Sequence, residues 1–178
     1  MNKIIQHVKE FLDKIYLIKL EGITDLDATA SVLTEDSKEL SRKILQTIID
    51  EMNVSLREDK VSRKEMGLVL HEKDRERKLL TELGEIEFSR DYYYRKEDGR
   101  YEYPLDKILS IEPRARIGET ICAKLVTKAT EESYGKSAAE VTGGVVSRQT
   151  VRNKILEAPV LEKQPEGREK RQVRVLDV

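Results

Sequence analysis

Apolar residues recur at steps of three and four over the first part of the chain, which is the spacing of one face of an α-helix. This stripe consists of Ile4, Val8, Phe11, Ile15 and Ile18. A second helix is predicted from Glu35 to Arg57, with apolar residues four apart at Leu40, Ile44, Ile48, Met52 and Leu56. Its opposite face is charged and suits solvent, but a narrow stripe on a long helix also suits pairing with a second copy.

The period changes to two over residues 67–104, which predicts a three-stranded antiparallel sheet. Ile86 and Phe88 begin an alternation with polar residues, and the turn Glu97-Asp98-Gly99 separates two extended segments. Asp-Gly between such segments is a strong hairpin signal. Gly84 is expected at a bulge or bend.

Five tyrosines lie on the two strands that this turn would align. Such rings can stack on nucleic-acid bases, or they can pair across strands and hold a small sheet together. Because the turn brings their strands side by side, we expect cross-strand pairing. The residues are Tyr92, Tyr93, Tyr94, Tyr101 and Tyr103.

A short connector is expected after Pro104, and a helix with a broad apolar face is predicted from Arg116 to Thr130. Cys122 falls on that face, so we expect a small buried hydrophobic residue and not a reactive thiol.

Residues 134–156 have the pattern of two short amphipathic helices joined at Gly143-Gly144, as in a helix-turn-helix. Ala138 and Ala139 would let the helices cross closely, and Ser147 is a good N-cap for the second helix. A helical hairpin that only packs or dimerises has the same pattern, so the two interpretations stay open at this point.

The second helix of this pair would leave one face free, because Val151 and Ile155 lie four apart and point inward together. Arginine, glutamine and asparagine on the free face can make two hydrogen bonds to a base edge in the major groove. Lysines flanking them would contact phosphates, and the arginine of the first turn could reach either a base or a phosphate. The candidate DNA contacts are Lys136, Arg148, Gln149, Arg152, Asn153 and Lys154.

The whole chain is nearly neutral, with 33 basic and 34 acidic residues among 178. A protein that binds DNA without specificity is usually basic throughout, so a nucleic-acid surface here must be local. Residues 134–156 are locally basic, because only Glu140 opposes the lysines and arginines there.

Composition excludes several other classes of protein and site. The single cysteine excludes an internal disulfide and a cysteine-based zinc site. His7 and His71 have no second ligand at metal spacing and are expected to be structural. No phosphate-binding loop, nucleophile elbow or metal-ligand cluster is present, so no catalytic or metal-binding residue is assigned. The chain has no signal peptide and no apolar run of about 20 residues, which predicts a cytoplasmic protein without a membrane partner.

Two segments carry a resemblance to a known family. LGEIEFSRDYYYRKEDGRYEYPLDKILSIEPRARIG and SYGKSAAEVTGGVVSRQTVRNKIL resemble bacterial insertion-sequence transposases of the Lre-type family, long filed as an uncharacterised protein family. The resemblance covers roughly residues 35–178 and is most specific over 79–156. The turn before Ser147 is two residues longer than in the commonest helix-turn-helix, and this longer turn is normal for the family that the chain resembles.

Members of that family are much longer than this chain. The resemblance implies an N-terminal DNA-binding region joined to a ribonuclease-H-like domain, whose carboxylates hold divalent metal for strand cleavage and transfer. Residues 171–178 resemble the first strand of that domain, cut off before its catalytic aspartate, and Asp177 is not assigned that role. We therefore expect no cofactor in this chain, with divalent metal only in a full-length homologue.

These patterns together predict a mainly α protein with a small antiparallel β-sheet, an α+β fold. Its parts would be an N-terminal helical region at 1–62, a tyrosine-rich sheet at 63–112, a helical domain with the helix-turn-helix at 113–157, and a linker with a truncated strand at 158–178. The expected function is binding of double-stranded DNA at element ends, without catalysis, and a second copy could pair through the N-terminal helices. The alternatives are a transcription regulator that uses the same helix pair and a non-functional transposase remnant.

Overall fold

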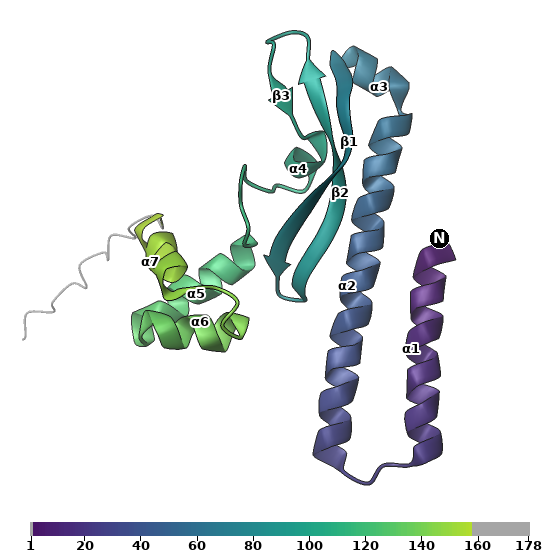
Figure 1. The fold of residues 1–178 in the computed structure, drawn as a ribbon, viewed down its shortest axis with the longest axis vertical. Helices are drawn as coiled ribbons and strands as arrows, with labels where there is room; N and C mark the ends of the chain where they lie inside the picture. The colour runs from purple at the N-terminus through teal and green to yellow at the C-terminus, as the bar shows by residue number, and fades with distance from the viewer. Residues whose placement is uncertain (1, 158–178) are drawn as a thin grey trace, which may run out of the picture.

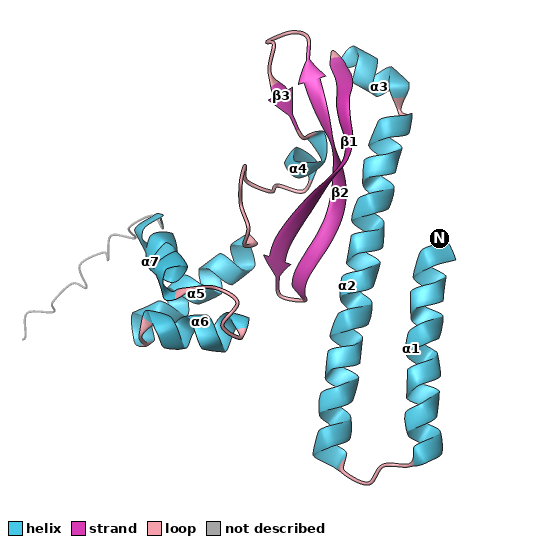
Figure 2. Ribbon diagram, viewed as in Figure 1, coloured by secondary structure: helices cyan, strands magenta, loops and turns pink. Residues whose placement is uncertain are grey.

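The computed structural model describes residues 2–157, which form seven helices and three strands (Figures 1 and 2). Helices dominate, and the strands form one small antiparallel sheet in the order β1-β2-β3. The predicted α+β fold class is therefore confirmed. The linker and final strand predicted at 158–178 lie outside the described residues.

A long antiparallel helical hairpin forms the N-terminal part of the molecule (Figure 1). It consists of α1 (Asn2–Glu21) and α2 (Leu26–Glu58), and the short helix α3 (Lys60–Glu65) follows. α2 begins well before the predicted Glu35, because the Asp25 carboxylate accepts a hydrogen bond from the Ala28 amide at 3.0 Å and caps the helix.

The predicted apolar stripe of α1 is only partly a contact surface. Ile4, Phe11 and Ile18 are half-buried in a helix that packs against α2, whereas Val8 and Ile15 stay on the exposed side. Polar pairs strengthen this contact, and they include an ion pair of 2.5 Å between the Lys14 Nζ and Asp36 Oδ1 atoms. The His7 Nε2 atom lies 3.4 Å from the Thr47 hydroxyl, as expected for a structural histidine.

The four-step stripe predicted on α2 accounts for only part of its buried face, since Met52 and Leu56 pack against the core beneath the sheet. Ile49 is buried in the core beneath the sheet and Leu45 packs against that core, whereas Ile48 is 41% exposed. α2 contacts α1 and β2 at the same time. Its apolar positions are therefore divided between two sides of the helix.

Two long strands form a twisted antiparallel ribbon, and a third strand adds only two residues to it. The strands are β1 (Leu68–Thr81), β2 (Gly84–Arg95) and β3 (Tyr101–Glu102). The bend predicted at Gly84 is the hairpin turn between β1 and β2, where this glycine has a φ of 99°. The predicted Asp-Gly turn joins β2 to β3, with Gly99 at a φ of 69°.

The ribbon changes its buried face halfway along β2. Ile86 and Phe88 are buried on one face, whereas Asp91 and Tyr93, three and five residues after Phe88, are buried on the other. β1 has two register irregularities at this level, beside Asp74 with a φ of 53°. Because such a bulge increases strand twist, each face of the ribbon is covered along only part of its length.

A buried polar network ties α2 to the ribbon. The Arg57 Nε atom donates to Asp91 Oδ2 at 2.7 Å, and the Asn53 side-chain oxygen accepts from the Asp91 amide at 2.9 Å. The amide of Asp74 donates to Asp91 Oδ1 at 3.0 Å. Burial alone would raise the pKa of Asp91, but these hydrogen bonds outweigh it and hold the pKa below its ordinary value.

The segment predicted as a connector contains a helix, α4 (Pro104–Ile108), so that prediction is corrected. Proline at the first helical position has a suitable φ and needs no amide partner. Leu105 is 1% exposed and packs in the core with Ile86 and Phe88, which explains why so short a helix is stable here.

Three helices form a separate module beside the tip of the β1–β2 hairpin (Figure 1). They are α5 (Glu119–Glu131), α6 (Tyr134–Thr142) and α7 (Arg148–Glu157). α5 begins later than the predicted Arg116, because the backbone just before it is hydrogen-bonded to Leu80 on β1. The Leu80 amide donates to the Arg116 carbonyl at 2.9 Å, and the Leu80 carbonyl accepts from the Gly118 amide at 2.8 Å. The core of the module also takes in Leu80 of β1, and its buried residues are Leu80, Ile121, Leu125, Ala138, Val146 and Val151.

Two further expectations concern Cys122 and membrane insertion. Cys122 is half-buried on α5, and burial raises the pKa of its thiol, as expected for a packing residue. Among the described helices, none has both the length and the apolar character needed to cross a bilayer.

Candidate nucleic-acid interface

Two consecutive glycines end α6 and open the connection to α7. Gly143 has a φ of 62° and Gly144 a φ of 83°, both in the left-handed region that favours glycine. The Gly144 amide donates to the Ala138 carbonyl at 3.3 Å, which satisfies a carbonyl at the end of α6. A β-carbon at either glycine would meet no atom within 4 Å, so the requirement is conformational and not steric.

α7 is held by a cap at one end and a buried residue at its centre. The Ser147 hydroxyl accepts a hydrogen bond from the Thr150 amide at 3.2 Å, which confirms the predicted N-cap. Val151 is fully buried and Ile155 packs against the same core, so their predicted inward direction is also confirmed.

One detail of the predicted helix crossing is wrong. Ser137 and Ala138 are buried where α6 meets the rest of the module, whereas Ala139 is exposed. Successive helical residues point about 100° apart, so three in a row cannot all face the same neighbour. The small crossing surface is therefore Ser-Ala, displaced by one residue from the predicted Ala-Ala.

The predicted contact residues of α7 lie together on its outer face. Arg148, Gln149, Arg152 and Asn153 are all exposed. The Gln149 Nε2 atom donates to Asn153 Oδ1 at 3.1 Å, so these two amides already form a pair. Within the described part of the chain, neither arginine has a carboxylate partner. Both guanidinium groups are therefore available to an external anion or base edge.

The two predicted lysine contacts differ from each other. Lys136 is exposed on α6. Lys154 is half-buried, and its Nζ atom lies 2.7 Å from Glu157 Oε2. The hydrogen bond with Glu157 raises the pKa of Lys154 above its ordinary value. Among the described residues the Lys136 ammonium has no carboxylate partner, whereas Lys154 is committed to its own helix.

Sequence reasoning missed one apolar member of this face. Leu156 is 69% exposed and lies seven residues after Gln149, on the same side of α7. The spacing of 149, 152, 153 and 156 is the repeat of one helical face, and that signal could have identified it. An exposed leucine among polar groups suits contact with a thymine methyl group.

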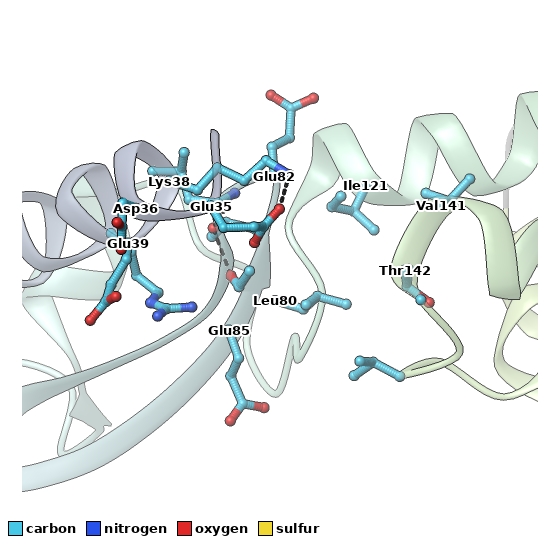
Figure 3. A pocket seen from close by; sticks show the side chains of 16 residues that line it. Glu35, Asp36, Lys38, Glu39, Leu80, Glu82, Glu85, Ile121, Val141 and Thr142 are labelled. Atoms are coloured by element: carbon cyan, nitrogen blue, oxygen red, sulfur yellow. Dashed lines mark hydrogen bonds and ion pairs between the residues drawn. The ribbon is translucent and has the colours of Figure 1, made fainter. Parts of the chain in front are cut away.

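A cleft of about 530 Å³ separates α2 from the module and the hairpin tip (Figure 3). Lys38 and Arg42 are the cations on its wall, and Lys124 forms an ion pair of 2.5 Å with one of its carboxylates. The acidic side chains that line it are Glu35, Asp36, Glu39, Glu82 and Glu85. This excess of negative charge does not suit a polyanion, so the basic face of α7 is the better candidate.

A divalent metal is what the resemblance to transposases implies for longer homologues. Among residues 2–157, no group of three or more histidine, cysteine, aspartate or glutamate side chains is arranged to hold a metal ion. The donor set for such an ion is therefore not found in this part of the molecule, and we derive no catalytic step from it.

Comparison with known proteins identifies the relatives of this chain. The model of the Uncharacterised protein family (UPF0236) matches residues 20–178. Two UPF0236 proteins of Caldanaerobacter subterraneus subsp. tengcongensis are similar, one with 42% identity over 155 residues and 87% of this chain, the other with 38% identity over 179 residues and 97% of this chain. These alignments cover 32% and 37% of the two relatives, so the chain spans about a third of their length. No solved structure matches. The chain belongs to the Uncharacterised protein family (UPF0236).

Proposed function

We propose that this chain is the DNA-binding N-terminal part of an insertion-sequence transposase, which recognises element ends and has no catalysis of its own. The observation that carries the proposal is the outer face of α7. Arg148 and Arg152 have no carboxylate partner in the described part of the chain, and they lie beside Gln149 and Asn153. The opposite side of the helix is fixed by the fully buried Val151, so the face is rigidly presented.

Each side chain has a definite part in this proposal. Gln149, Arg152 and Asn153 would contact base edges in the major groove, where bidentate amide and guanidinium groups discriminate between base pairs. Arg148 and Lys136 would contact phosphates, and the amino end of α7 adds a favourable dipole for an anion. Lys154 contributes less, because Glu157 already neutralises it.

The greater length of the compared family members supports the proposal. About two thirds of each compared relative lies outside the part that this chain matches. A separate catalytic domain of the longer proteins would fit there, and the described residues hold no metal-binding cluster of their own. The chain would then supply recognition and leave chemistry to the remainder of the longer protein.

A second copy of the chain is the partner that we propose for the N-terminal helices. α1 has no buried residue, and large apolar side chains on it are exposed: Ile5, Leu12, Tyr16, Leu17 and Leu20. A dimer would place two α7 helices on two half-sites and raise affinity by linking two binding events. Sedimentation equilibrium should show dimers that dissociate in a Leu12→Gln variant. A monomer at all concentrations would contradict the dimer.

The DNA proposal is tested by salt-titrated fluorescence anisotropy on duplexes carrying the terminal repeats of the element, with a shuffled duplex as competitor. We expect Arg152→Ala to weaken binding by about 1–3 kcal/mol and to reduce the preference for the terminal sequence. Arg148→Ala should weaken terminal and shuffled duplexes alike and reduce the salt dependence. Lys64→Ala is the matched control, since Lys64 is an exposed cation on α3.

Equal affinity for terminal and shuffled DNA, unchanged by both arginine variants, would contradict the proposal. Tight and specific binding to an inverted repeat upstream of a promoter, with none at element ends, would instead favour a transcription regulator. Absence of binding to every duplex would favour a non-functional remnant.

A further inference from the structure

Rings and guanidinium groups share a face of the ribbon that α2 does not cover. The ribbon twists after Phe88, so that Asp91 and Tyr93 are buried toward α2 while the alternate residues of β2 point the other way. We call this surface the tyrosine–arginine face, and its members are His71, Arg75, Arg90, Tyr92, Tyr101 and Tyr103.

The rings of this face form an ordered row. The centroid of Tyr92 lies 4.6 Å from that of Tyr103 and 5.2 Å from that of Tyr101, with interplanar angles of 29° and 23°. His71 meets Tyr101 edge-on at 4.9 Å. The predicted cross-strand pairing of tyrosines is therefore confirmed.

Pairing alone does not account for the exposure of the row. Tyr101 is 49% exposed, whereas Tyr93 on the opposite face is 1% exposed. β3 contains only two residues, and no other described element covers Tyr101 beyond the rings around it. A stack held rigid by its neighbours and open at Tyr101 is a preorganised surface for another flat ring.

Arginines lie between the rings. The guanidinium carbon of Arg90 lies 3.6 Å from the centroid of Tyr103, and that of Arg75 lies 5.2 Å from the centroid of Tyr92. Arg75 also donates to the Tyr103 hydroxyl at 2.8 Å, and its Nε atom lies 3.4 Å from Glu72 Oε2, while 43% of its side chain is exposed. Arg75 is thus held beside the row while its guanidinium still reaches solvent.

Positive charge beneath the face is incompletely balanced. Arg77 donates to Asp106 Oδ2 at 2.8 Å, and Arg90 donates to the same oxygen. The Nε atoms of both arginines and the Oδ1 atom of Asp106 are buried without a hydrogen-bond partner. Burial and the neighbouring Arg77 charge lower the pKa of Arg90 to about 10.

We propose that the tyrosine–arginine face binds an unpaired nucleic-acid strand, with one base stacked on Tyr101 and an adjacent phosphate at Arg75. Unpaired bases offer a free ring face to an aromatic platform, whereas the bases of a duplex are already stacked on each other. This site lies on the sheet and is separate from the outer face of α7. It does not depend on duplex recognition by that helix.

The test measures anisotropy of a fluorescein-labelled oligothymidylate of about 12 nucleotides, which is within the usual site size of one such platform. The full chain is compared with Tyr101→Leu, Tyr101→Phe and Arg75→Gln. Tyr134→Leu is the matched control, because Tyr134 is an exposed tyrosine on α6 outside this face and leucine keeps that position apolar. Thermal melts by circular dichroism establish that each variant is folded.

We expect Tyr101→Leu and Arg75→Gln each to weaken the Kd about tenfold, and Tyr101→Phe and Tyr134→Leu to stay within about twofold of the parent chain. The double change Arg148→Ala with Arg152→Ala should leave single-strand binding unchanged, which separates this site from the duplex site. If Tyr101→Leu does not fold, the contrast between Arg75→Gln and the parent chain decides the question.

Four results would overturn the proposal. The first is no measurable binding of the oligothymidylate. The second is binding that Tyr101→Leu and Arg75→Gln both leave intact. The third is binding that disappears in the Arg148 and Arg152 double variant, because the strand would then lie on α7. The fourth is equal competition by heparin, a polyanion without bases, because binding would then not need a stacked base.

Discussion

The three-helix module and the N-terminal helical hairpin use the same helical periodicity in opposite ways. The module consists of short helices, yet Leu125 and Val151 in its core are fully buried. Its exposed face on α7 is polar and includes two arginines. α1 is twenty residues long and has no buried residue, while large apolar side chains such as Leu12 and Tyr16 are exposed.

This difference shows that the length and apolar content of a helix do not indicate how much of its apolar surface is buried. Helices in proteins are stabilised mainly by packing of an apolar face against other elements. The module buries most of its apolar residues in a core shared with Leu80 of β1, and its outer face is mostly polar, which suits the proposed DNA partner. The hairpin buries only one side of α1 against α2. The other side has exposed apolar side chains, which suit contact with a second protein surface.

The largest expected effect contrasts one leucine from each region. Leu125→Ala should lower the free energy of unfolding by about 4 kcal/mol, because it leaves a cavity in a fully buried core. Leu12→Ala should lower it by less than about 1 kcal/mol, since Leu12 is 56% exposed. Urea denaturation followed by circular dichroism at low protein concentration measures both. Equal losses would mean that α1 is as fully packed as the module.

The second-largest effect is expected for the buried polar network that joins α2 to the sheet. Asp91→Asn should cost about 2 kcal/mol, because the half-buried Arg57 would keep only the more exposed Asp74 as a carboxylate partner. Asp13→Asn is the matched control, as Asp13 is exposed on α1. A loss below about 1 kcal/mol, measured by urea denaturation, would show that the network contributes little.

The same carboxylate makes stability depend on pH. The pKa of Asp91 is lower in the folded protein than its unfolded value of about 3.9. Its contribution is therefore fully present above about pH 4 and is lost as the pH falls through the folded pKa. Unfolding measured from pH 7 down to pH 2 should show a smaller loss for Asp91→Asn than for the parent chain. Parallel curves would contradict this assignment.

The parts of the fold that local signals specify were predictable. The Asp-Gly turn before β3, the glycines between α6 and α7, and the cap at Ser147 each depend on a few neighbouring residues. The start of α2 was missed although Asp25 is a recognisable N-cap, because no apolar repeat follows it immediately. α4 was missed because it is short and its stability comes from burial of Leu105.

Features that depend on tertiary contacts were not predictable. The alternation along β2 was read correctly, but the change of buried face after Phe88 depends on a bulge in β1 at Asp74. The candidate residues of α7 share a face as predicted, because helical geometry is local. The ion pair between Lys154 and Glu157 was equally predictable, because the two residues lie three positions apart on one helix.

A smaller effect tests the connection between α6 and α7. Gly143→Ala and Gly144→Ala should each cost about 1 kcal/mol, because alanine is strained at the positive φ of both positions. Gly135→Ala is the control with opposite sign. This glycine lies within α6 with nothing near its added methyl group, so alanine should stabilise by about 0.5–1 kcal/mol. Three losses of equal size would show that backbone conformation is not the cause.

The smallest effect is expected at the free face of the module itself. Arg152→Ala should change the free energy of unfolding by less than about 0.5 kcal/mol, because the guanidinium has no carboxylate partner in the described residues. Lys154→Ala should cost slightly more, up to about 1 kcal/mol, since it breaks the contact with Glu157. A cost above 1 kcal/mol for Arg152→Ala in urea denaturation would reveal an internal role for this side chain. If Arg152→Ala leaves the free energy of unfolding unchanged but greatly weakens duplex binding, the module's outer face serves recognition and not stability. The exposed apolar residues of α1 would differ from it, because their proposed role is association between copies.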